Sequence, residues 1–354
     1  MINYFNSKYI EILRCIADLK YGIPIFLEDK GQRILVFPVE RINKEVFEYA
    51  KSTFEEVYLI ISQQRAKYLK FKNCKIICKD ITFNNIEDIV FKVGFNNKNQ
   101  YNFDKEATID NKAVEIMKLS ELIPAALVIK LDCDDKFNFK MNSLKVDCIE
   151  NYINFLSDDL YEISSADLKL KDGYGEIKCF RSQFSKDHYA IIIYPKGSKK
   201  LKSIPTVRVH SSCFTGDLLN SIKCDCHDQL HNAIKVMGKD DGGIIVYLNQ
   251  EGRGIGLTNK IRVYRVQSKG YDTVEANMNL GLDDDARAFQ IAARILKKLK
   301  VKKINLLSNN PAKARDLKNN EILVEKIISH QFFNSEIKEY YKSKVKKFKH
   351  SIEI

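Results

Sequence analysis

The sequence predicts an α/β protein of two domains. Its 354 residues are enough to form two hydrophobic cores. Over the first 130 residues, segments with the apolar period of helices alternate with short apolar runs that are typical of strands. Glycine-rich and polar motifs are instead concentrated between Arg208 and Lys313. We therefore expect an α/β domain over residues 1–130, a connector over 131–160 and a second domain over 161–354 that carries these motifs.

The elements of the first domain follow from apolar periodicity. Apolar residues spaced three or four apart predict helices, and short apolar runs between turn residues predict strands. Asn43 is a typical cap for a further helix that follows it. The Asn-rich segment 83–111 interrupts the pattern, and no element is predicted there. We expect helices over residues 8–20, 63–69 and 112–122 and strands over residues 23–27, 34–37, 57–61 and 125–129.

The connector and the start of the second domain are less regular. Three aspartates in the connector precede an expected amphipathic helix near residues 146–155. A β-rich region follows, with a strand over residues 189–194 and a solvated loop over 196–200. This loop leads into a strand that ends at His210.

Composition is that of a globular protein. Hydrophobic residues make up 45% of the chain and charged residues 29%. No apolar run has membrane-spanning length, and the N-terminus lacks the core of a signal peptide. The nine cysteines are odd in number and unevenly spaced, which does not fit a disulfide framework. We therefore expect a cytoplasmic protein with reduced thiols and no membrane partner.

The net charge of +12 raises a nucleic-acid hypothesis. Lysines are scattered along the whole sequence, however, and only residues 342–349 form a dense basic run. A polyanionic nucleotide substrate would also benefit from positive potential. We therefore do not expect a nucleic-acid partner.

Three cysteines lie at a spacing suited to a metal. Cys213, Cys224 and Cys226 form a C-x10-C-x-C pattern. Structural zinc sites are closed by four protein ligands, whereas catalytic zinc keeps one position for water. The nearby His210, His227 and His231 could supply a fourth ligand. The spacing alone therefore leaves both a structural and a catalytic zinc site open.

A glycine-rich segment after the cysteines suits a phosphate. Gly252, Gly254 and Gly256 allow backbone amides to approach a ligand, and a helix expected near Leu257 would present its positive end. Guanidinium groups such as that of Arg253 fit phosphate oxygens. A plain turn is the alternative, because a lone Gly-x-Gly is weak evidence.

Five motifs in one order make the pattern specific, and with them the chain resembles GTP cyclohydrolase II over roughly residues 160–354. The motifs are Val-Arg-Val-His-Ser-Ser-Cys213-Phe-Thr-Gly-Asp, Lys-Cys224-Asp-Cys226, Asn-Gln-Glu251-Gly-Arg253-Gly-Ile-Gly-Leu, Gly270-Tyr-Asp-Thr273-Val-Glu-Ala-Asn and Leu-Leu-Ser308-Asn-Asn-Pro-Ala-Lys313.

The resemblance implies a catalytic domain with a mixed sheet over residues 161–354. It also implies the first step of riboflavin biosynthesis. GTP would be hydrolysed to 2,5-diamino-6-hydroxy-4-(5-phosphoribosylamino)pyrimidine, formate and pyrophosphate by a homodimer. Cys213, Cys224 and Cys226 would hold one Zn²⁺ per subunit, and Mg²⁺ would accompany the triphosphate. The substrate-binding residues implied are Arg208, Val209, His210, Ser211, Ser212, Gln229, Glu251, Gly252, Arg253, Thr273, Ser308 and Lys313.

Three further residues have implied catalytic roles. The resemblance makes Asp285 a proton acceptor, Tyr264 a proton donor or water-orienting group, and Arg287 a nucleophile on the α-phosphate. A guanidinium is protonated at ordinary pH, so stabilising the departing pyrophosphate is a physically easier role for Arg287. Asp285 and Arg287 could alternatively form only the solvated first turn of a helix.

Two other functions stay open. Ser212 and His227 depart from the family pattern, which leaves room for a related enzyme that stops at the formylated pyrimidine. A non-catalytic regulator that binds zinc and nucleotide is the second alternative. Ala286 and Ser308 replace a Glu and a Thr of the family.

The layout of the first domain resembles 3,4-dihydroxy-2-butanone 4-phosphate synthase. That family carries an acid-rich loop after its first strand, whereas this chain has Leu27-Glu-Asp-Lys-Gly-Gln-Arg33. Residues 1–160 also contain no histidine. Because magnesium needs oxygen ligands and the enediol chemistry needs an acid–base pair, we expect this domain to be catalytically inactive.

Overall fold

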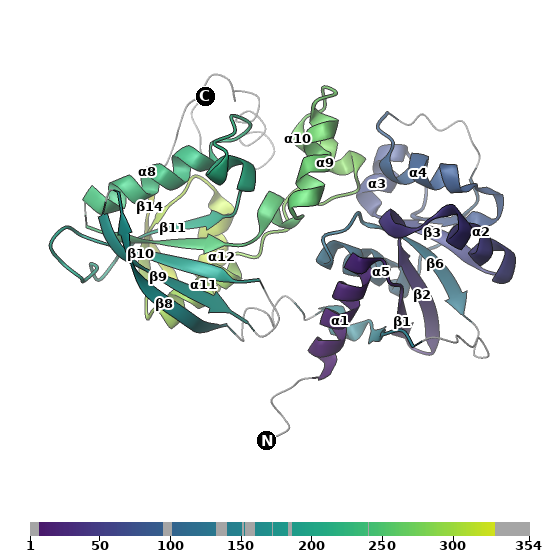
Figure 1. The fold of residues 1–354 in the computed structure, drawn as a ribbon, viewed down its shortest axis with the longest axis horizontal. Coiled ribbons are helices and arrows are strands. Elements are labelled where there is room, and N and C mark those ends of the chain that lie inside the picture. Colours follow the sequence, from purple (N-terminus) through teal and green to yellow (C-terminus); the bar gives the residue numbers. More distant parts are fainter. Residues whose placement is uncertain are drawn as a thin grey trace. The chain divides into compact units, whose positions relative to one another are not determined.

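The computed structural model describes residues 7–94, 101–131, 140–150, 152, 160–171, 173–182, 186–239 and 241–329. The chain divides into two compact units (Figure 1). Unit 1 comprises Met1–Tyr152 and Ile255–Ala286, and unit 2 comprises Ile153–Gly254 and Arg287–Ile354.

The packing units differ from the predicted sequence ranges. Ile255–Ala286 was expected within the second domain but belongs to unit 1. Its helices pack on the N-terminal part of the chain, which apolar periodicity within a segment does not reveal. The functional domains over 1–130, 131–160 and 161–354 stay a prediction.

Unit 1 is built on a seven-stranded sheet of order β5-β4-β3-β6-β2-β1-β7, in which β1 and β7 are parallel and the other pairs antiparallel. Every residue of β3 is buried, as expected for a central strand covered on both faces. The strands are β1 Ile25–Asp29, β2 Gln32–Pro38, β3 Val57–Ile61, β4 Lys75–Ile77, β5 Phe103–Asp104, β6 Ala125–Leu131 and β7 Ser143–Lys145.

The helices of unit 1 confirm most of the predicted elements. Asn43 caps α2 by accepting a hydrogen bond from the amide of Val46 at 2.8 Å. The helices are α1 Ser7–Tyr21, α2 Lys44–Thr53, α3 Gln63–Leu69, α4 Phe83–Phe91, α5 Thr108–Leu119, α6 Asp147–Glu150, α9 Leu257–Gln267 and α10 Thr273–Asn279, with short 3₁₀ turns at Val39–Arg41 and Cys78–Asp80.

One prediction for unit 1 was wrong. The Asn-rich segment 83–111 contains α4 and β5. The asparagines obscured an apolar stripe, because Ile86, Ile89 and Val90 are all buried on one side of α4. Asn85 even helps to begin this helix by accepting a hydrogen bond from the amide of Thr82. The expected helix near 146–155 is observed as α6, and most of the remainder lies outside the described residues.

Unit 2 contains a second mixed sheet, of order β14-β13-β11-β12-β10-β9-β8. The β14-β13-β11-β12 part is parallel, and β12-β10-β9-β8 is antiparallel. The strands are β8 Tyr161–Leu170, β9 Gly173–Arg181, β10 His188–Tyr194, β11 Thr206–Ser211, β12 Gly243–Leu248, β13 Lys303–Leu307 and β14 Leu323–Ile328. The α/β class with a mixed sheet in the second domain is confirmed.

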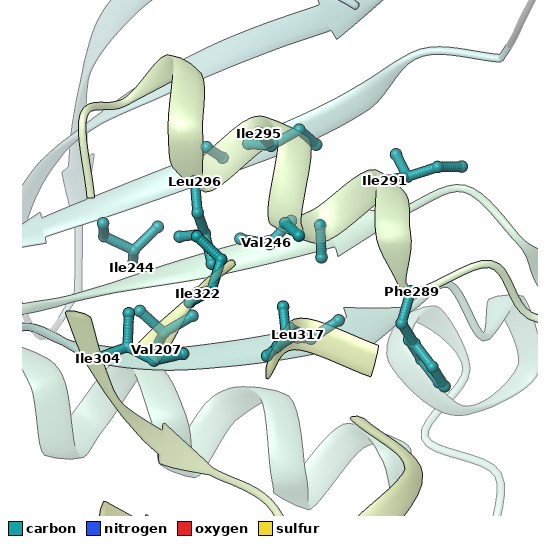
Figure 2. Packing of buried hydrophobic residues seen from close by; sticks show 14 of the residues in the cluster. Val207, Ile244, Val246, Phe289, Ile291, Ile295, Leu296, Ile304, Leu317 and Ile322 are labelled. Carbon is teal, nitrogen blue, oxygen red and sulfur yellow. The ribbon is translucent and has the colours of Figure 1, made fainter. Parts of the chain in front are cut away.

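Helices cover both faces of this sheet. They are α8 Cys226–Lys239, α11 Gln290–Lys298 and α12 Pro311–Asn319. The larger core joins α11 and α12 to the strands through Leu296, Leu317, Val246 and Ile304 (Figure 2). Ala233 and Met237 of α8 pack in a smaller core on Ile245.

This topology places the candidate site. The parallel strands β11 and β12 end at Ser211 and Leu248, which are paired with each other. Ligands in open α/β sheets bind beyond the carboxyl ends of parallel strands. Cys213 follows β11 and Glu251 follows β12, so two of the predicted motifs meet at this edge. No helix among the described ranges has the length and hydropathy to cross a membrane.

Candidate active site

The three predicted zinc ligands form a cluster at the end of β11. Cys213 follows that strand, and Cys226 is the first residue of α8. Their Sγ atoms and that of Cys224 all lie within 4.8 Å of one another, and Cys213 Sγ is 3.6 Å from Cys224 Sγ. The fold therefore brings together thiols that are eleven and thirteen positions apart in sequence.

The cluster has the shape and chemistry of a metal site. A Cβ on Gly216 would lie 2.8 Å from Cys224 Sγ and 3.0 Å from Cys213 Sγ, so the turn that carries this glycine closes around the thiols. The hydrogen bond with Cys213 and burial raise the pKa of Cys224 to about 11. The same contact raises the pKa of Cys226 well above its ordinary value. A cation is needed to hold all three as thiolates, because like charges so close oppose ionisation.

Histidines do not complete this cluster in the described part of the chain. The group of possible metal ligands contains the three cysteines and no histidine. The His227 and His231 rings lie against each other with centroids 4.1 Å apart. His210 Nε2 instead lies 3.0 Å from Asp217 Oδ1. The geometry favours the three-ligand arrangement over a site closed by histidine.

Asp217 organises the loop around the first cysteine. Its Oδ2 accepts hydrogen bonds from the amide of Cys213 at 3.0 Å and from the Tyr247 hydroxyl at 2.9 Å. Because a carboxylate only accepts, the proton shared with His210 lies on Nε2. Burial lowers the pKa of His210, which favours the neutral ring.

Three buried polar atoms at the end of β11 have no hydrogen-bond partner among the described residues. They are His210 Nδ1, Ser211 Oγ and Ser212 Oγ. Such atoms are rare in proteins, because each unmade bond costs about 1–3 kcal/mol. Their position beside Cys213 suits a polar ligand that would supply the partners.

Arg208 lies on β11 and is only 3% exposed. Its guanidinium donates to Gln229 Oε1 and to the backbone oxygen of Leu307 at 3.4 Å. Gln229 in turn donates to Asp225 Oδ2 at 2.5 Å. Burial lowers the pKa of Arg208 to about 10, so the side chain remains cationic at neutral pH. The predicted pair of Arg208 and Gln229 is therefore in direct contact.

Glu251 links the glycine loop to the cysteine loop. Its carboxylate accepts hydrogen bonds from the amide of Phe214 at 2.6 Å and from that of Gly252 at 2.9 Å. Gly252 and Arg253 both have left-handed backbone conformations, with φ of 61° and 62°. That conformation is unusual for Arg253, and backbone strain of this kind concentrates at functional sites.

Two predicted phosphate-binding cations converge on one aromatic ring. The Arg287 guanidinium lies 5.0 Å from the Phe289 ring centroid, and Lys313 Nζ lies 5.6 Å from it. Lys313 Nζ also donates to the backbone oxygen of Val209 at 2.7 Å. Ser308 Oγ accepts from the amide of Asn310, the residue that caps α12. The last predicted motif thus lies beside β11.

Comparisons with known proteins identify the family. The sequence profile described as GTP cyclohydrolase II matches residues 161–329. A GTP cyclohydrolase-2 from Psychromonas ingrahamii is 44% identical over 178 residues, which cover 50% of this chain and 88% of that protein. The chain belongs to the GTP cyclohydrolase II family. The predicted family is thereby confirmed.

A second relative extends the similarity beyond the profile. The riboflavin biosynthesis protein RibBA from Endomicrobium trichonymphae is 36% identical over 253 residues, covering 68% of this chain and 62% of that protein. Residues 161–354 make up little more than half of this chain, so this alignment includes part of the N-terminal half. The match nevertheless spans less than two thirds of the RibBA protein.

One solved structure aligns along most of the chain. It is RibBX, a two-domain 3,4-dihydroxy-2-butanone 4-phosphate synthase from A. baumannii, which covers 92% of this chain and 100% of its own at 17% identity. The TM-score is 0.33, which is too low to support an argument about fold or function.

The remaining predicted site residues of this GTP cyclohydrolase II family member lie in unit 1. Tyr264 is half-buried on α9, and Lys260 Nζ lies 5.7 Å from its ring centroid. Thr273 begins α10 and its hydroxyl accepts from Gln267 at 2.9 Å. Asp285 is exposed and lies in an irregular segment. The alternative of a solvated first helical turn is wrong, because α11 begins only at Gln290.

Sequence reasoning assigned no role to several residues that shape the site. Asp217 and Asp225 lie inside the cysteine motifs, and their hydrogen bonds to Cys213, Tyr247 and Gln229 were the missing information. Phe289 belongs to none of the predicted motifs. Its role became apparent from the structure, in which the side chains of Arg287 and Lys313 both lie against its ring. Gly216 acts through the space that it leaves for the thiols.

Gly216 offers a test of the candidate metal site that changes none of the candidate ligands. Replacing Gly216 by alanine is expected to lower zinc affinity about 10–100-fold, as when an outer partner of a metal site is disturbed. Competition with a chromophoric chelator measures this affinity. Gly173→Ala is the matched control, since its Cβ would meet atoms no closer than 3.5 Å. Equal zinc affinity of the two variants would show that zinc binding does not need the space beside the thiols at Gly216.

Proposed function

We propose that this protein is a zinc-dependent GTP cyclohydrolase II that converts GTP to 2,5-diamino-6-hydroxy-4-(5-phosphoribosylamino)pyrimidine, formate and pyrophosphate. The observation that carries the proposal is the three-thiol cluster in a chain of this family. Beside it, polar atoms of His210, Ser211 and Ser212 have no hydrogen-bond partner within the described ranges.

Cys213, Cys224 and Cys226 would hold one Zn²⁺ per chain. Zinc, when bound, supplies a Lewis acid that lowers the pKa of a coordinated water for hydrolysis at carbon 8. Asp217 contributes by fixing the backbone of Cys213 through its amide. Mg²⁺ would chelate the triphosphate, because it binds phosphate oxygens and retains several waters.

The chain supplies cations for the phosphates. Arg208, Arg253, Arg287 and Lys313 are the candidates, and fixed charges of this kind stabilise a departing pyrophosphate. The contacts of Lys313 with Val209 and with the Phe289 ring hold it next to β11. The hydroxyls of Ser211 and Ser212 would bind other polar atoms of the nucleotide.

The carboxylate of Glu251 is proposed to accept hydrogen bonds from the N–H groups of guanine. A carboxylate has about four acceptor sites, so its hydrogen bonds from Phe214 and Gly252 are compatible with this role. These two bonds also orient the carboxylate. Tyr264, Thr273 and Asp285 are proposed to complete the machinery as proton donor, polar contact and proton acceptor.

The synthase-like part is proposed to lack synthase activity. A cavity of about 590 Å³ opens beside the loop that replaces the acid-rich segment. Its charged lining residues are three carboxylates, Glu28, Asp29 and Asp147, and three cations, Lys30, Arg33 and Lys145. The cations compete with magnesium for the carboxylate oxygens, which supports a site without the metal. We further propose a homodimer located in the cytoplasm, acting on free GTP.

Product analysis tests the proposed reaction. Zinc-loaded protein with GTP and Mg²⁺ should release formate and pyrophosphate in equal amounts, and ribulose 5-phosphate should give no product. Pyrophosphate without formate would instead indicate the enzyme that stops at the formylated pyrimidine. Folded, zinc-loaded protein that leaves GTP intact would refute the enzymatic proposal and favour the regulator.

A further inference from the structure

The segment Ile255–Ala286, here called the helical insert, carries three proposed site residues but packs within unit 1. Tyr264 lies on α9, Thr273 on α10 and Asp285 near the end of the insert. Within unit 1, α10 packs on α3 (Figure 1). The insert therefore depends for its packing on residues that precede the cyclohydrolase motifs by more than 80 positions.

One set of contacts holds α9. The Arg262 guanidinium donates to both carboxylate oxygens of Glu40, at 2.9 and 2.6 Å. Paired bonds of this type fix orientation as well as distance. Asn259, which is 1% exposed, donates to the backbone oxygen of Glu121 at 3.0 Å. At Gly256, just before the helix, a Cβ would lie 3.0 Å from the Glu121 side chain, so the two backbones approach closely.

A second set holds the chain after α10. Arg65 is 2% exposed, and its guanidinium donates to the backbone oxygen of Asn279 and to Asn279 Oδ1. The Ser62 hydroxyl donates to the backbone oxygen of Gly281 at 2.7 Å. A Cβ on Gly281 would lie 2.5 Å from Ser62 Oγ, and the residue has φ +72°. Glycine is therefore required at this close approach.

A third set lies two residues before Asp285. Asp283 Oδ1 accepts from Gln64 Nε2 at 2.5 Å and from Lys118 Nζ at 2.8 Å. Both donors come from the N-terminal part, Gln64 from α3 and Lys118 from α5. These bonds restrict the backbone that leads into the proposed proton acceptor.

We propose that the N-terminal part of unit 1, Met1–Tyr152, is a scaffold that positions the helical insert for the cyclohydrolase reaction. Glu40, Arg65 and Lys118 would act through their contacts with this insert. This inference rests on the proposed function, which gives Tyr264 and Asp285 their roles. It assigns the synthase-like part a task that needs no synthase chemistry. A displacement of about 1 Å at reacting groups can lower a rate about 100-fold, so contacts far from the reacting atoms influence turnover.

Two scaffold variants test the proposal in the zinc-loaded, full-length protein. Glu40→Gln is isosteric and weakens the paired bonds to Arg262, and Lys118→Gln removes a cation from Asp283. The matched control is Glu56→Gln, which breaks ion pairs with Lys75 at 3.0 Å and Lys130 at 2.7 Å in the same part of unit 1. No described contact joins Glu56 to the insert.

The expected result separates positioning from a general loss of stability. kcat for formate release should fall about tenfold or more in Glu40→Gln and in Lys118→Gln and stay within about twofold of wild type in Glu56→Gln. Zinc content should be unchanged in all three, and the thermal midpoints of the variants should match that of the control. Hydrogen exchange should quicken at α9 and α10 in the scaffold variants only.

The outcomes that count against the proposal are distinct. Wild-type release of formate tests the proposed function before any variant is compared, and its absence would remove the basis of this inference. Active wild type with kcat preserved in both scaffold variants would overturn the positioning role. Lys118 has a side chain that is 30% exposed, so its replacement keeps the test valid should Glu40→Gln fail to fold.

Discussion

Replacing Cys224 by serine is expected to abolish both zinc binding and formate release. The thiol is 3.6 Å from that of Cys213 in a three-cysteine cluster, and a serine hydroxyl does not ionise to replace a thiolate. Zinc affinity should fall by more than the roughly 10–100-fold typical for the loss of an outer-shell partner. Metal analysis by atomic emission and a formate assay on the same sample measure the two effects together.

Cys179 provides the control for this substitution. It is a half-buried free cysteine on β9 and does not belong to the cluster of Cys213, Cys224 and Cys226. Cys179→Ser should keep one zinc per chain and wild-type turnover. A Cys224→Ser protein that retains stoichiometric zinc and full turnover would refute the assignment of the cluster as the catalytic metal site.

The second large effect is expected at Arg287. Arg287→Ala should lower kcat about 10²–10³-fold, the usual cost of removing a group that stabilises developing charge. Zinc content should not change, because Arg287 contacts the Phe289 ring and the candidate zinc ligands are the three cysteines. Single-turnover release of pyrophosphate measures the step concerned.

Arg287→Lys separates the two roles proposed for this residue. A lysine keeps the positive charge without the fork of donors, so an electrostatic role predicts activity between that of wild type and that of Arg287→Ala. A nucleophilic role predicts a covalent guanylyl adduct on the wild-type chain, detectable by mass spectrometry during turnover. Detection of that adduct would contradict the electrostatic account.

The sequence was sufficient for elements with a strong local signal. The apolar run that became β3 and the pattern that became α3 both appear at the predicted residues, because burial on both faces or on one stripe is encoded locally. It was insufficient where polar residues mask the stripe. α4 was missed for this reason, since its apolar positions Ile86, Ile89 and Val90 lie among asparagines.

The residues of the candidate site likewise fall into those that the sequence predicted and those that it did not. Motif order predicted the cysteine cluster, which the fold assembles from β11, its following turn and α8. Roles that depend on distant contacts could not be predicted. The role of Asp217 follows from its hydrogen bonds with Cys213 and Tyr247. The packing of the helical insert follows from its hydrogen bonds with Glu40 and Arg65. Such contacts depend on tertiary structure and leave no periodic signal.

Titration of metal-free protein with zinc tests the central claim most directly. The rate of formate release from GTP, with Mg²⁺ present, should rise in proportion to the zinc bound and should level off at one equivalent per chain. A full rate in rigorously metal-free protein would contradict a zinc-dependent reaction. No formate release from folded protein that has bound one equivalent would contradict the proposed cyclohydrolase activity itself.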